Sequence, residues 1–204
     1  MKYAIIMLVK YMKIEIGVSN RHIHLKKEDL EVLFGEGYKL TIKNELKQPG
    51  QYAAHETLTI ETDKSTIENV RVLGPVRGYT QVEISKTDAY KLGLNPPVRD
   101  SGELSGSDKI TIIGPKGEVS INEGVIIATR HIHLSKEHVK AYNLENKEIV
   151  NVKLFGEKGG IIENVHLKVS DEATLELHID TDDANAHLVK SGDIGEILWR
   201  KNFY

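Results

Sequence analysis

One pentapeptide occurs twice without change, and no other feature of the sequence constrains the fold as strongly. Arg21-His22-Ile23-His24-Leu25 returns as Arg130-His131-Ile132-His133-Leu134, about 109 residues further on. A strand-like alternation precedes each copy, and a short helical pattern follows it. The chain is therefore predicted to be an internal repeat that carries one pentapeptide in each half.

The two histidine pairs predict metal binding. Side chains alternate along an extended segment, so both histidines of a pair lie on one side while the isoleucine points the other way, into apolar packing. Two neutral imidazoles on one side are half of a metal site. Four of the nine histidines belong to these pairs. Four further histidines have no paired neighbour and are interpreted as structural or surface residues: His55, His138, His166 and His187.

Composition narrows the classes of function. The 204 residues are 40% hydrophobic and 28% charged, which is ordinary for a soluble globular protein. A net charge of −3 and the lack of a Lys/Arg stripe argue against a nucleic-acid partner. The absence of cysteine excludes disulfides, thiolate zinc sites and a cysteine nucleophile, and it fits a cytoplasmic protein. Any metal must then be held by histidine, carboxylate, solvent or substrate.

Residues 1–12 are interpreted as an N-terminal extension. The apolar run at 1–9 is too short to span a bilayer, and no small-residue cleavage site follows it, so neither a membrane span nor a secretory signal is expected. The run is compatible with a first strand, with a short amphipathic peptide that docks on a partner, or with an early start codon. Met12 is the alternative start.

Strand signals dominate the rest of the chain. Strands are expected at 13–18, 38–42, 57–62, 69–73, 79–85, 109–113, 119–121, 125–134, 149–155, 161–170, 174–180 and 194–199, and short helices at 26–34, 87–92, 136–142 and 184–190. Gly35, Gly93 and Gly192 suit helix ends, and Ser135 suits a helix start.

These elements predict a mainly β fold with short helices: two related β-barrel lobes from the internal repeat, with the active site between them. The first lobe is placed at 13–94 with the first His-x-His, and the second at 108–204 with the second. Residues 95–107, rich in Pro, Gly and Ser, form the junction. The lobes are free to exchange strands in this scheme.

Three further residues are candidates for chemistry. Glu83 lies mid-strand between apolar neighbours, where it could complete a metal site or simply face water. His178 has the same alternation and the same two interpretations. Arg77 lies in a Gly-Pro-Val-Arg-Gly turn six residues before Glu83, where a guanidinium suits an oxyanion such as phosphate, although a surface arginine in a hairpin is the commoner case.

Seven segments in a fixed order carry a resemblance to a known family. They are Ser-Asn-Arg-His-Ile-His-Leu at 19–25, Gln-Pro-Gly-Gln-Tyr-Ala-Ala at 48–54, Leu-Gly-Pro-Val-Arg at 73–77, Thr-Gln-Val-Glu-Ile-Ser at 80–85, Pro-Val-Arg-Asp-Ser-Gly at 97–102, Arg-His-Ile-His at 130–133 and His-Ile-Asp-Thr-Asp-Asp-Ala-Asn-Ala at 178–186. From about Gly17 to about Val189 the chain resembles the PduL-type phosphate propanoyltransferase (phosphotransacylase) family.

The resemblance implies two β-barrel domains with short capping helices and a pair of zinc ions in the site between them. It assigns the metal ligands as His22, His24, Glu83, His131, His133 and His178. Arg77 matches the phosphate-binding catalytic arginine. Coenzyme A contacts fall on Ser19, Arg71, Leu73, His178 and Asn185, with a basic residue near Lys43.

The resemblance also implies acyl transfer between coenzyme A and phosphate. The expected reaction converts propanoyl-CoA or acetyl-CoA and phosphate, reversibly, into the acyl phosphate and coenzyme A, by direct transfer without an acyl-enzyme. A homodimer, a role in propanediol degradation and association with a bacterial microcompartment are further expectations, although the brief N-terminal segment favours a free cytoplasmic protein.

Three other functions fit the same histidine pairs. A zinc-dependent thioester hydrolase would use them to activate water. A β-barrel oxygenase would bind iron through them and a glutamate. A non-catalytic metal-binding or shell-associated module would bind metal without turning over acyl-CoA. The ordered set of segments favours the acyltransferase over all three.

Overall fold

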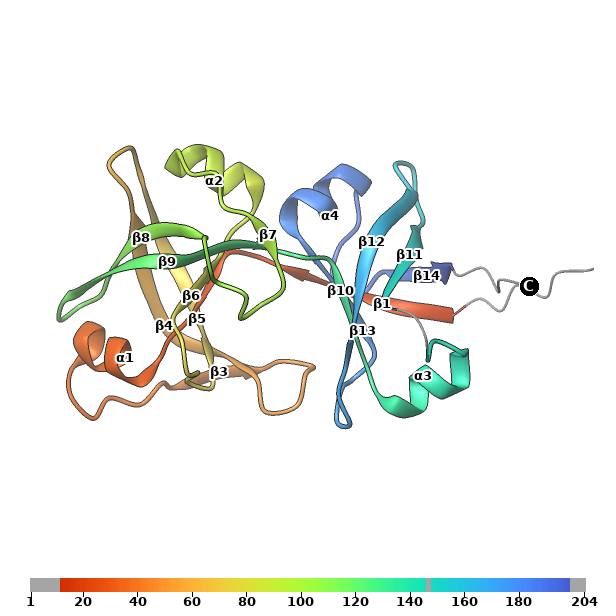
Figure 1. The fold of residues 1–204 in the computed structure, drawn as a ribbon, viewed down its shortest axis with the longest axis horizontal. Coiled ribbons are helices and arrows are strands. Elements are labelled where there is room, and N and C mark those ends of the chain that lie inside the picture. The colour runs from red at the N-terminus through yellow and green to blue at the C-terminus, as the bar shows by residue number, and fades with distance from the viewer. Residues whose placement is uncertain (1–11, 146–147, 199–204) are drawn as a thin grey trace, which may run out of the picture. The chain divides into compact units, whose positions relative to one another are not determined.

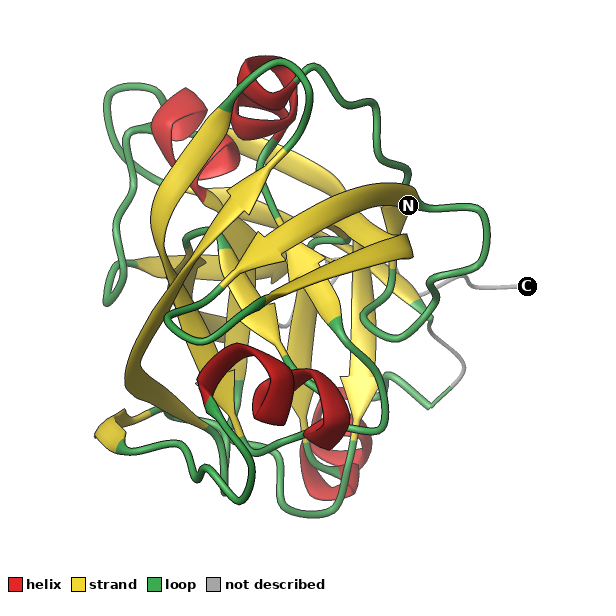
Figure 2. Ribbon diagram, turned by 90° about the vertical axis from the view of Figure 1, so that its left-hand side faces the viewer, coloured by secondary structure: helices red, strands yellow, loops and turns green. Residues whose placement is uncertain are grey.

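The computed structural model describes residues 12–145 and 148–198, and these fall into two compact units (Figure 1). The unit with the first histidine pair, here the His22 unit, comprises residues 19–129 and 180–182. The unit with the second pair, the His131 unit, comprises residues 12–18, 130–179 and 183–198 as far as they are described. Each unit has a separate apolar core. Strands make up most of the secondary structure of the described chain (Figure 2).

The His22 unit is built on a closed sheet. Its elements are β2 (His22–His24), α1 (Lys27–Phe34), β3 (Ile42–Glu45), β4 (Tyr52–Glu61), β5 (Thr66–Gly74), β6 (Gln81–Glu83), α2 (Lys86–Leu92), β7 (Val98–Arg99), β8 (Asp108–Ile113) and β9 (Glu118–Ala128). The strand order is β3-β4-β5-β2-β6-β9-β7, and β8 pairs with both β4 and β9. That double pairing closes β4, β5, β2, β6, β9 and β8 into a barrel.

The His131 unit is a second closed barrel. Its elements are β1 (Met12–Ser19), β10 (His131–Leu134), α3 (Lys136–Tyr142), β11 (Ile149–Leu154), β12 (Gly160–Val169), β13 (Glu176–Asp180), α4 (Thr181–His187) and β14 (Ile194–Leu198). The strand order is β1-β13-β10-β12-β11-β14, with β14 pairing back to β1.

The prediction of a mainly β fold with two related barrels is confirmed, and strand pairing shows the relationship. In the His22 unit, β2 pairs parallel with β5 and antiparallel with β6. In the His131 unit, β10 pairs parallel with β12 and antiparallel with β13. The middle isoleucines of the two pentapeptides, Ile23 and Ile132, are each fully buried in the core of their own unit, as the alternation predicts.

The two units do not coincide with the predicted lobes at 13–94 and 108–204. The strand before the first histidine pair belongs to the His131 unit, and the strand before the second pair belongs to the His22 unit. β1 runs into the first pair but forms its ladder with β14. β9 runs into the second pair but lies between β6 and β8. The junction at 95–107 lies in the His22 unit, where β7 pairs with β9. The exchange that the sequence scheme left open therefore involves one strand in each direction.

Some element boundaries differ from the sequence predictions, since side chains compete for backbone groups. The strand expected at 38–42 begins only at Ile42, because the backbone N–H of Thr41 donates to the buried Glu56 carboxylate instead of a strand partner. The strand expected at 79–85 is three residues long, and Ser85 caps α2 by accepting from the Asp88 N–H. The strand expected at 125–134 is interrupted at residues 129–130, between β9 and β10.

Helix ends follow the sequence more closely. Ser135 caps α3 as predicted, and Gly93 ends α2 in the left-handed conformation with φ 68°. The last helix begins at Thr181, three residues before its predicted start. Residues 1–11, most of the predicted extension, and Trp199 at the end of the predicted last strand lie outside the described residues.

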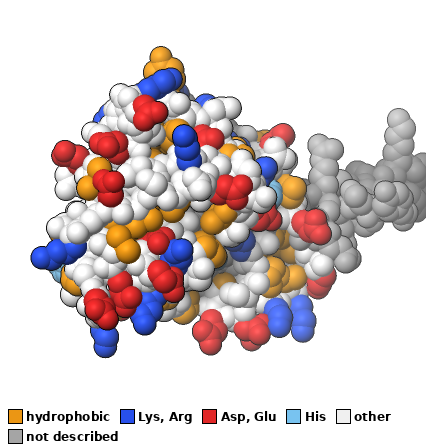
Figure 3. All heavy atoms as spheres, turned by 60° about the vertical axis from the view of Figure 1, so that its left-hand side comes forward, with side chains coloured by type: hydrophobic (Ala, Val, Ile, Leu, Met, Phe, Trp, Pro, Cys, Tyr) orange, Lys and Arg blue, Asp and Glu red, His pale blue; other side chains and the backbone are white. Residues whose placement is uncertain are grey.

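The surface matches the balanced composition. On the face shown in Figure 3, acidic and basic side chains are interspersed over the described residues. Within that same part of the chain, none of the helices has both the length and the apolar character needed to cross a membrane.

Glu56 gives a testable pH dependence of stability. Burial raises the pKa of this carboxyl, but hydrogen bonds from the Thr41 hydroxyl and N–H and from the Tyr38 hydroxyl outweigh burial and hold it below its ordinary 4.5. Because the folded pKa is the lower one, the carboxylate stabilises the fold above pH 4.5, and this stabilisation is lost as pH falls through the folded pKa.

The free energy of unfolding of Glu56→Gln should therefore be about 1–3 kcal/mol lower than that of the unmutated protein at neutral pH, and this difference should shrink in acid. Urea unfolding at several pH values measures it. Glu68→Gln, an exposed glutamate on β5, is the matched control and should unfold like the unmutated protein at neutral pH. A deficit of equal size well below pH 4.5 would contradict the assignment.

Candidate active site

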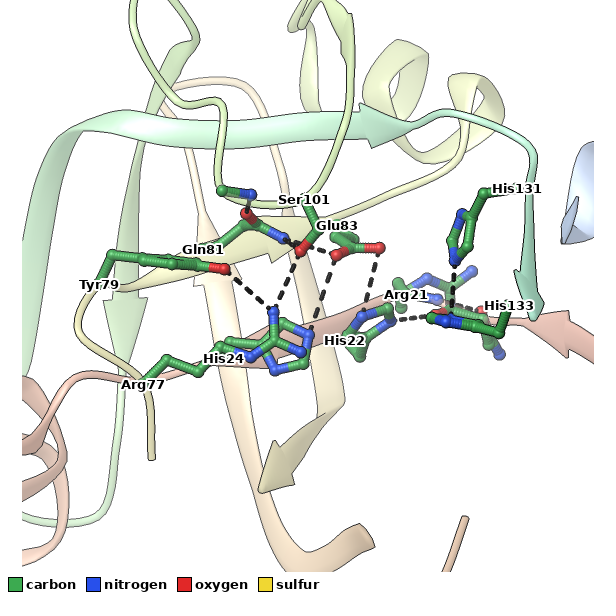
Figure 4. Close-up of polar contacts among 12 residues, drawn as sticks. Arg21, His22, His24, Arg77, Tyr79, Gln81, Glu83, Ser101, His131 and His133 are labelled. Carbon is green, nitrogen blue, oxygen red and sulfur yellow. Dashed lines mark hydrogen bonds and ion pairs between the residues drawn. The ribbon is translucent and has the colours of Figure 1, made fainter. Parts of the chain in front are cut away.

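Three side chains converge in the His22 unit, two from β2 and one from the neighbouring strand. His22 lies directly opposite Glu83 in the antiparallel β2–β6 pair. The His22 Nε2 atom is 3.4 Å from Glu83 Oε2, and His24 Nε2 is 3.9 Å from Glu83 Oε1 (Figure 4). The three donor atoms lie within 4.8 Å of one another. The two imidazoles are on one side of the strand, as the alternation predicts, with ring centroids 4.9 Å apart.

The protonation pattern of these histidines fits a metal. His22 Nδ1 lies 2.9 Å from the Asn20 carbonyl, which can only accept, so the neutral ring carries its proton on Nδ1 and has Nε2 available as a ligand atom. His24 Nδ1 is buried with no hydrogen-bond partner among the residues that the structure describes. Three ligands of the His/His/carboxylate type leave coordination positions open for substrate, as catalytic zinc sites do.

The electrostatics of the pair are asymmetric. Burial lowers the pKa of His22, but the charge and hydrogen bond of Glu83 outweigh it and leave that pKa above the ordinary 6.5. Burial also lowers the pKa of His24, and the positive charges of His22 and Arg77 lower it further, to about 2. The proton of this pair therefore resides on His22 rather than on His24, and a cation bound by the group would displace it.

Arg77 is held beside this group by its backbone. Its N–H donates to the carbonyl of Leu25, the residue after His24, at 2.8 Å. In the same loop, the Thr80 hydroxyl accepts from the Lys26 N–H and donates to Asp29. These bonds fix the turn after β5 against the end of the histidine strand.

Within residues 12–145 and 148–198, the Arg77 guanidinium has only neutral partners, two hydroxyl groups and the face of the Tyr79 ring, whose centroid is 6.0 Å from Cζ. Its Nη1 donates to the Ser101 hydroxyl at 3.1 Å and to the Tyr79 hydroxyl at 3.3 Å (Figure 4). No contact of its Nη2 or Nε with another described residue is present, and no carboxylate pairs with it there. A half-buried arginine of this kind has its charge and two donor nitrogens available for an anion.

Gln81 joins the arginine to the group of His22, His24 and Glu83. Its side chain is fully buried, and its Nε2 donates to both Glu83 Oε1 at 2.5 Å and Ser101 Oγ at 2.9 Å. Its Oε1 accepts from the Gly102 N–H at 2.8 Å, which fixes the orientation of the amide. Arg77, Ser101, Gln81 and Glu83 thus form one hydrogen-bonded chain.

The His131 unit holds a second group of potential ligands, His131, His133 and His178, whose donor atoms also lie within 4.8 Å of one another. His131 faces His178 across the antiparallel β10–β13 pair, as His22 faces Glu83 in the other unit. The three ring centroids are 4.8 to 5.1 Å apart. Burial and the positive charges of His178 and Lys168 lower the pKa of His133 to about 4, so this imidazole is neutral at physiological pH.

Glu176 supports the second group. Its carboxylate is buried and lies 2.7 Å from His178 Nε2. The backbone of β1 passes close by at Gly17, where a Cβ atom would stand 2.8 Å from Glu176 Oε1 and 3.1 Å from the His178 ring. Glycine at this position leaves room for the carboxylate and the imidazole together.

Comparison with known proteins identifies the group to which this chain belongs. The sequence model of phosphate propanoyltransferase matches residues 15–190. The chain belongs to the phosphate propanoyltransferase family. A phosphate propanoyltransferase of Thermotoga maritima is 54% identical over 94% of this chain and 92% of its own length. Others are those of Priestia megaterium, 51% identical over 89% and 84%, and Lachnoclostridium phytofermentans, 48% identical over 91% and 87%. The predictions of this family and of an enzyme are confirmed.

The residues predicted to contact coenzyme A are distributed over both units of this family member. Ser19, Arg71 and Leu73 are half-buried in the His22 unit. Arg71 lies opposite His22 on β5, and its Nη1 donates to the carbonyls of Ala54 and His55. Asn185 is exposed on α4 and Lys43 is exposed on β3, while His178 belongs to the second ligand group. Their role in binding coenzyme A stays a prediction.

Sequence reasoning missed the residues that orient the ligands. Asn20, Gln81, Ser101 and Glu176 contact the candidate site residues directly. Alternation could have indicated two of them, since Gln81 precedes Glu83 by two residues and Glu176 precedes His178 by two. Of the unpaired histidines, His138 completes the cap of α3, His187 contacts the Lys158 carbonyl, His166 lies beside His131 on β12 and His55 is exposed.

Proposed function

We propose that this chain interconverts a short-chain acyl-CoA (propanoyl-CoA or acetyl-CoA) and phosphate with the corresponding acyl phosphate and coenzyme A. We further propose that it depends on zinc, with one ion held by His22, His24 and Glu83 and another by His131, His133 and His178. The relatives' name supports the acyl group and the phosphate. The donor sets support zinc, since imidazole and carboxylate are ordinary zinc ligands and the chain has no cysteine.

The observation that carries the proposal is Arg77. Its guanidinium, free of any carboxylate among the described residues, is linked through Ser101 and Gln81 to the metal-ligand carboxylate of Glu83. An anion bound by Arg77 would lie near the metal group, because the charge of Arg77 already affects the pKa of both His22 and His24. Phosphate fits such a position, since a guanidinium can grip two of its oxygens at once.

The reaction forms one bond and breaks one. A phosphate oxygen forms a bond to the acyl carbon, the C–S bond of the thioester breaks, and coenzyme A leaves as its thiolate. Arg77 would hold the phosphate and offset its charge, while Gln81 keeps the Glu83 carboxylate in place. Zinc at these ligands would supply a Lewis acid that polarises the thioester carbonyl and favours departure of the sulfur.

Direct transfer suits these residues better than an acyl-enzyme. The chain has no cysteine, and Ser101 is the hydroxyl nearest to the arginine. Among the described residues, the two groups that contact Ser101 Oγ are Arg77 Nη1 and Gln81 Nε2, which are N–H donors and cannot accept its proton. An unactivated serine is a weak nucleophile. We therefore propose a sequential mechanism. A homodimer and association with a microcompartment stay predictions.

The test is release of free thiol from propanoyl-CoA by the zinc-loaded protein, with and without phosphate. We expect release that depends strictly on phosphate and yields propanoyl phosphate. Release at the same rate without phosphate would establish a thioester hydrolase instead. Parallel lines in double-reciprocal plots, which indicate ping-pong kinetics, together with a trapped acyl-enzyme would contradict direct transfer.

A further inference from the structure

The arginine that opens each repeated pentapeptide makes the same contact in both units. Arg21 Nε donates to Asp88 Oδ2 at 2.8 Å and its Nη2 lies 2.7 Å from Asp88 Oδ1. Arg130 Nε donates to Asp183 Oδ2 at 2.9 Å and its Nη2 lies 2.7 Å from Asp183 Oδ1. Both are side-on, two-point ion pairs that use the same four atoms, the geometry in which arginine and carboxylate interact most strongly.

The two aspartates occupy equivalent places relative to the metal ligands. Asp88 lies on α2, five residues after Glu83, and Asp183 lies on α4, five residues after His178. Each helix directly follows the strand that supplies the third ligand of its unit. The ion pair therefore ties the start of the histidine strand to the helix beyond the third ligand.

The ligand strands need such a tie because their own pairing is short. In the His22 unit, β2 and β6 are three residues long each, and the His22–Glu83 pair lies at the end of their ladder. A ladder of this length fixes the distance between strands but resists fraying weakly. Asp88 is only 4% exposed, so loss of its pairing with the partly exposed Arg21 would leave a buried carboxylate without its cationic partner.

We propose that Arg21 and Arg130 are positioning residues for the metal sites, each fixing, through its aspartate, the third ligand of its own unit relative to the histidine pair. This inference rests on the proposed metal binding. Neither arginine supplies a donor atom to the ligand groups. The duplicated contact also explains why the repeat includes an arginine that neither ligates nor binds phosphate in the proposed mechanism.

The test measures zinc affinity in full-length proteins that retain one site each. His131→Ala/His133→Ala leaves the His22 unit as the site, and His22→Ala/His24→Ala leaves the His131 unit. Competition with a chromophoric chelator gives the affinity, and the visible spectrum of the cobalt form reports the ligand geometry. Asp88→Asn should weaken zinc binding about 10- to 100-fold at the His22 site and leave the His131 site unchanged, and Asp183→Asn should do the reverse.

A matched control separates positioning from a general loss of stability. Asp171→Asn removes the same charge from an ion pair with Lys136 in which both side chains are 70% exposed, and it should change neither affinity. Arg21→Lys keeps the charge but not the two-point contact, and it should weaken zinc binding several-fold even if Asp88→Asn does not fold. Folded Asp88→Asn or Arg21→Lys protein with unchanged affinity, or an equal loss at both sites, would overturn the inference. Parent proteins that bind no zinc at either site would overturn the metal proposal itself.

Discussion

Replacement of His24 by alanine is expected to lower phosphate-dependent thiol release from propanoyl-CoA about 1000-fold and to remove the metal from the His22 unit. His24 is the most deeply buried of the three potential ligands, with its Nε2 directed toward Glu83 and a pKa of about 2 that keeps it neutral. Two ligands hold zinc far less well than three, and loss of a Lewis acid worth several kcal/mol in the transition state corresponds to about three powers of ten in rate.

The measurement pairs kcat/KM with metal content of the same preparation. His55→Ala is the control, since His55 is an exposed histidine on β4 outside both ligand groups, and it should change neither quantity. Removal of metal from the unmutated protein by a chelator should reproduce the loss, and added zinc should restore activity there but not in His24→Ala. Full activity in a chelated, metal-free protein would refute zinc dependence.

The histidine pairs show which part of the site could be predicted from the sequence. Alternation along a strand is local, so the placing of His22 and His24 on one side, and of Ile23 in the core, follows from three consecutive residues. The third candidate ligand is not local. Glu83 faces His22 only because β6 pairs with β2 across some sixty residues of chain. Alternation made Glu83 a candidate, but only the ladder brings it within reach of both imidazoles.

The exchange of β1 and β9 shows why domain boundaries could not be predicted in the same way. Each strand continues directly toward a histidine pair, and sequence order alone would keep it with that pair. Its apolar residues decide otherwise: Ile14 and Ile16 of β1 pack in the core of the His131 unit, and Val125 of β9 packs in that of the His22 unit. Alternation indicates which face of a strand is buried but not which of two similar cores receives it.

The two candidate ligand groups differ in composition although they share one register. The position opposite the first histidine is Glu83 in one unit and His178 in the other, and the position opposite the second histidine is Gln81 in one and Glu176 in the other. In the His22 unit the Gln81 amide contacts the Glu83 carboxylate. In the His131 unit the Glu176 carboxylate contacts the His178 imidazole. In both units the candidate ligand opposite the first histidine is thus held by a hydrogen bond, but it is a carboxylate in the His22 unit and an imidazole in the His131 unit. The candidate donor set of the His22 unit is therefore the more anionic of the two.

Replacement of Arg77 by lysine is expected to lower kcat/KM for phosphate about 100-fold or more, although the positive charge is kept. Arg77 has Nη2 and Nε available together, whereas a lysine has a single ammonium group and cannot grip two phosphate oxygens. The lysine also cannot donate to Ser101 and to phosphate in the geometry that Arg77 has. Misplacement of the attacking oxygen by about 1 Å alone can cost about two powers of ten in rate. Arg77→Gln, which also removes the charge, should lose more.

Steady-state kinetics with phosphate and propanoyl-CoA varied separately measure this effect. Arg99→Lys is the matched control, since Arg99 is an exposed arginine on β7 whose Nη1 donates to the Val98 carbonyl and to no other described residue, and it should leave both constants unchanged. Metal content of Arg77→Lys should equal that of the unmutated protein, because Arg77 contributes no ligand atom. A loss confined to the kinetic constants for propanoyl-CoA would show that Arg77 does not bind phosphate. A variant that keeps thiol release but loses its dependence on phosphate would show that Arg77 selects phosphate over water as the acceptor of the acyl group.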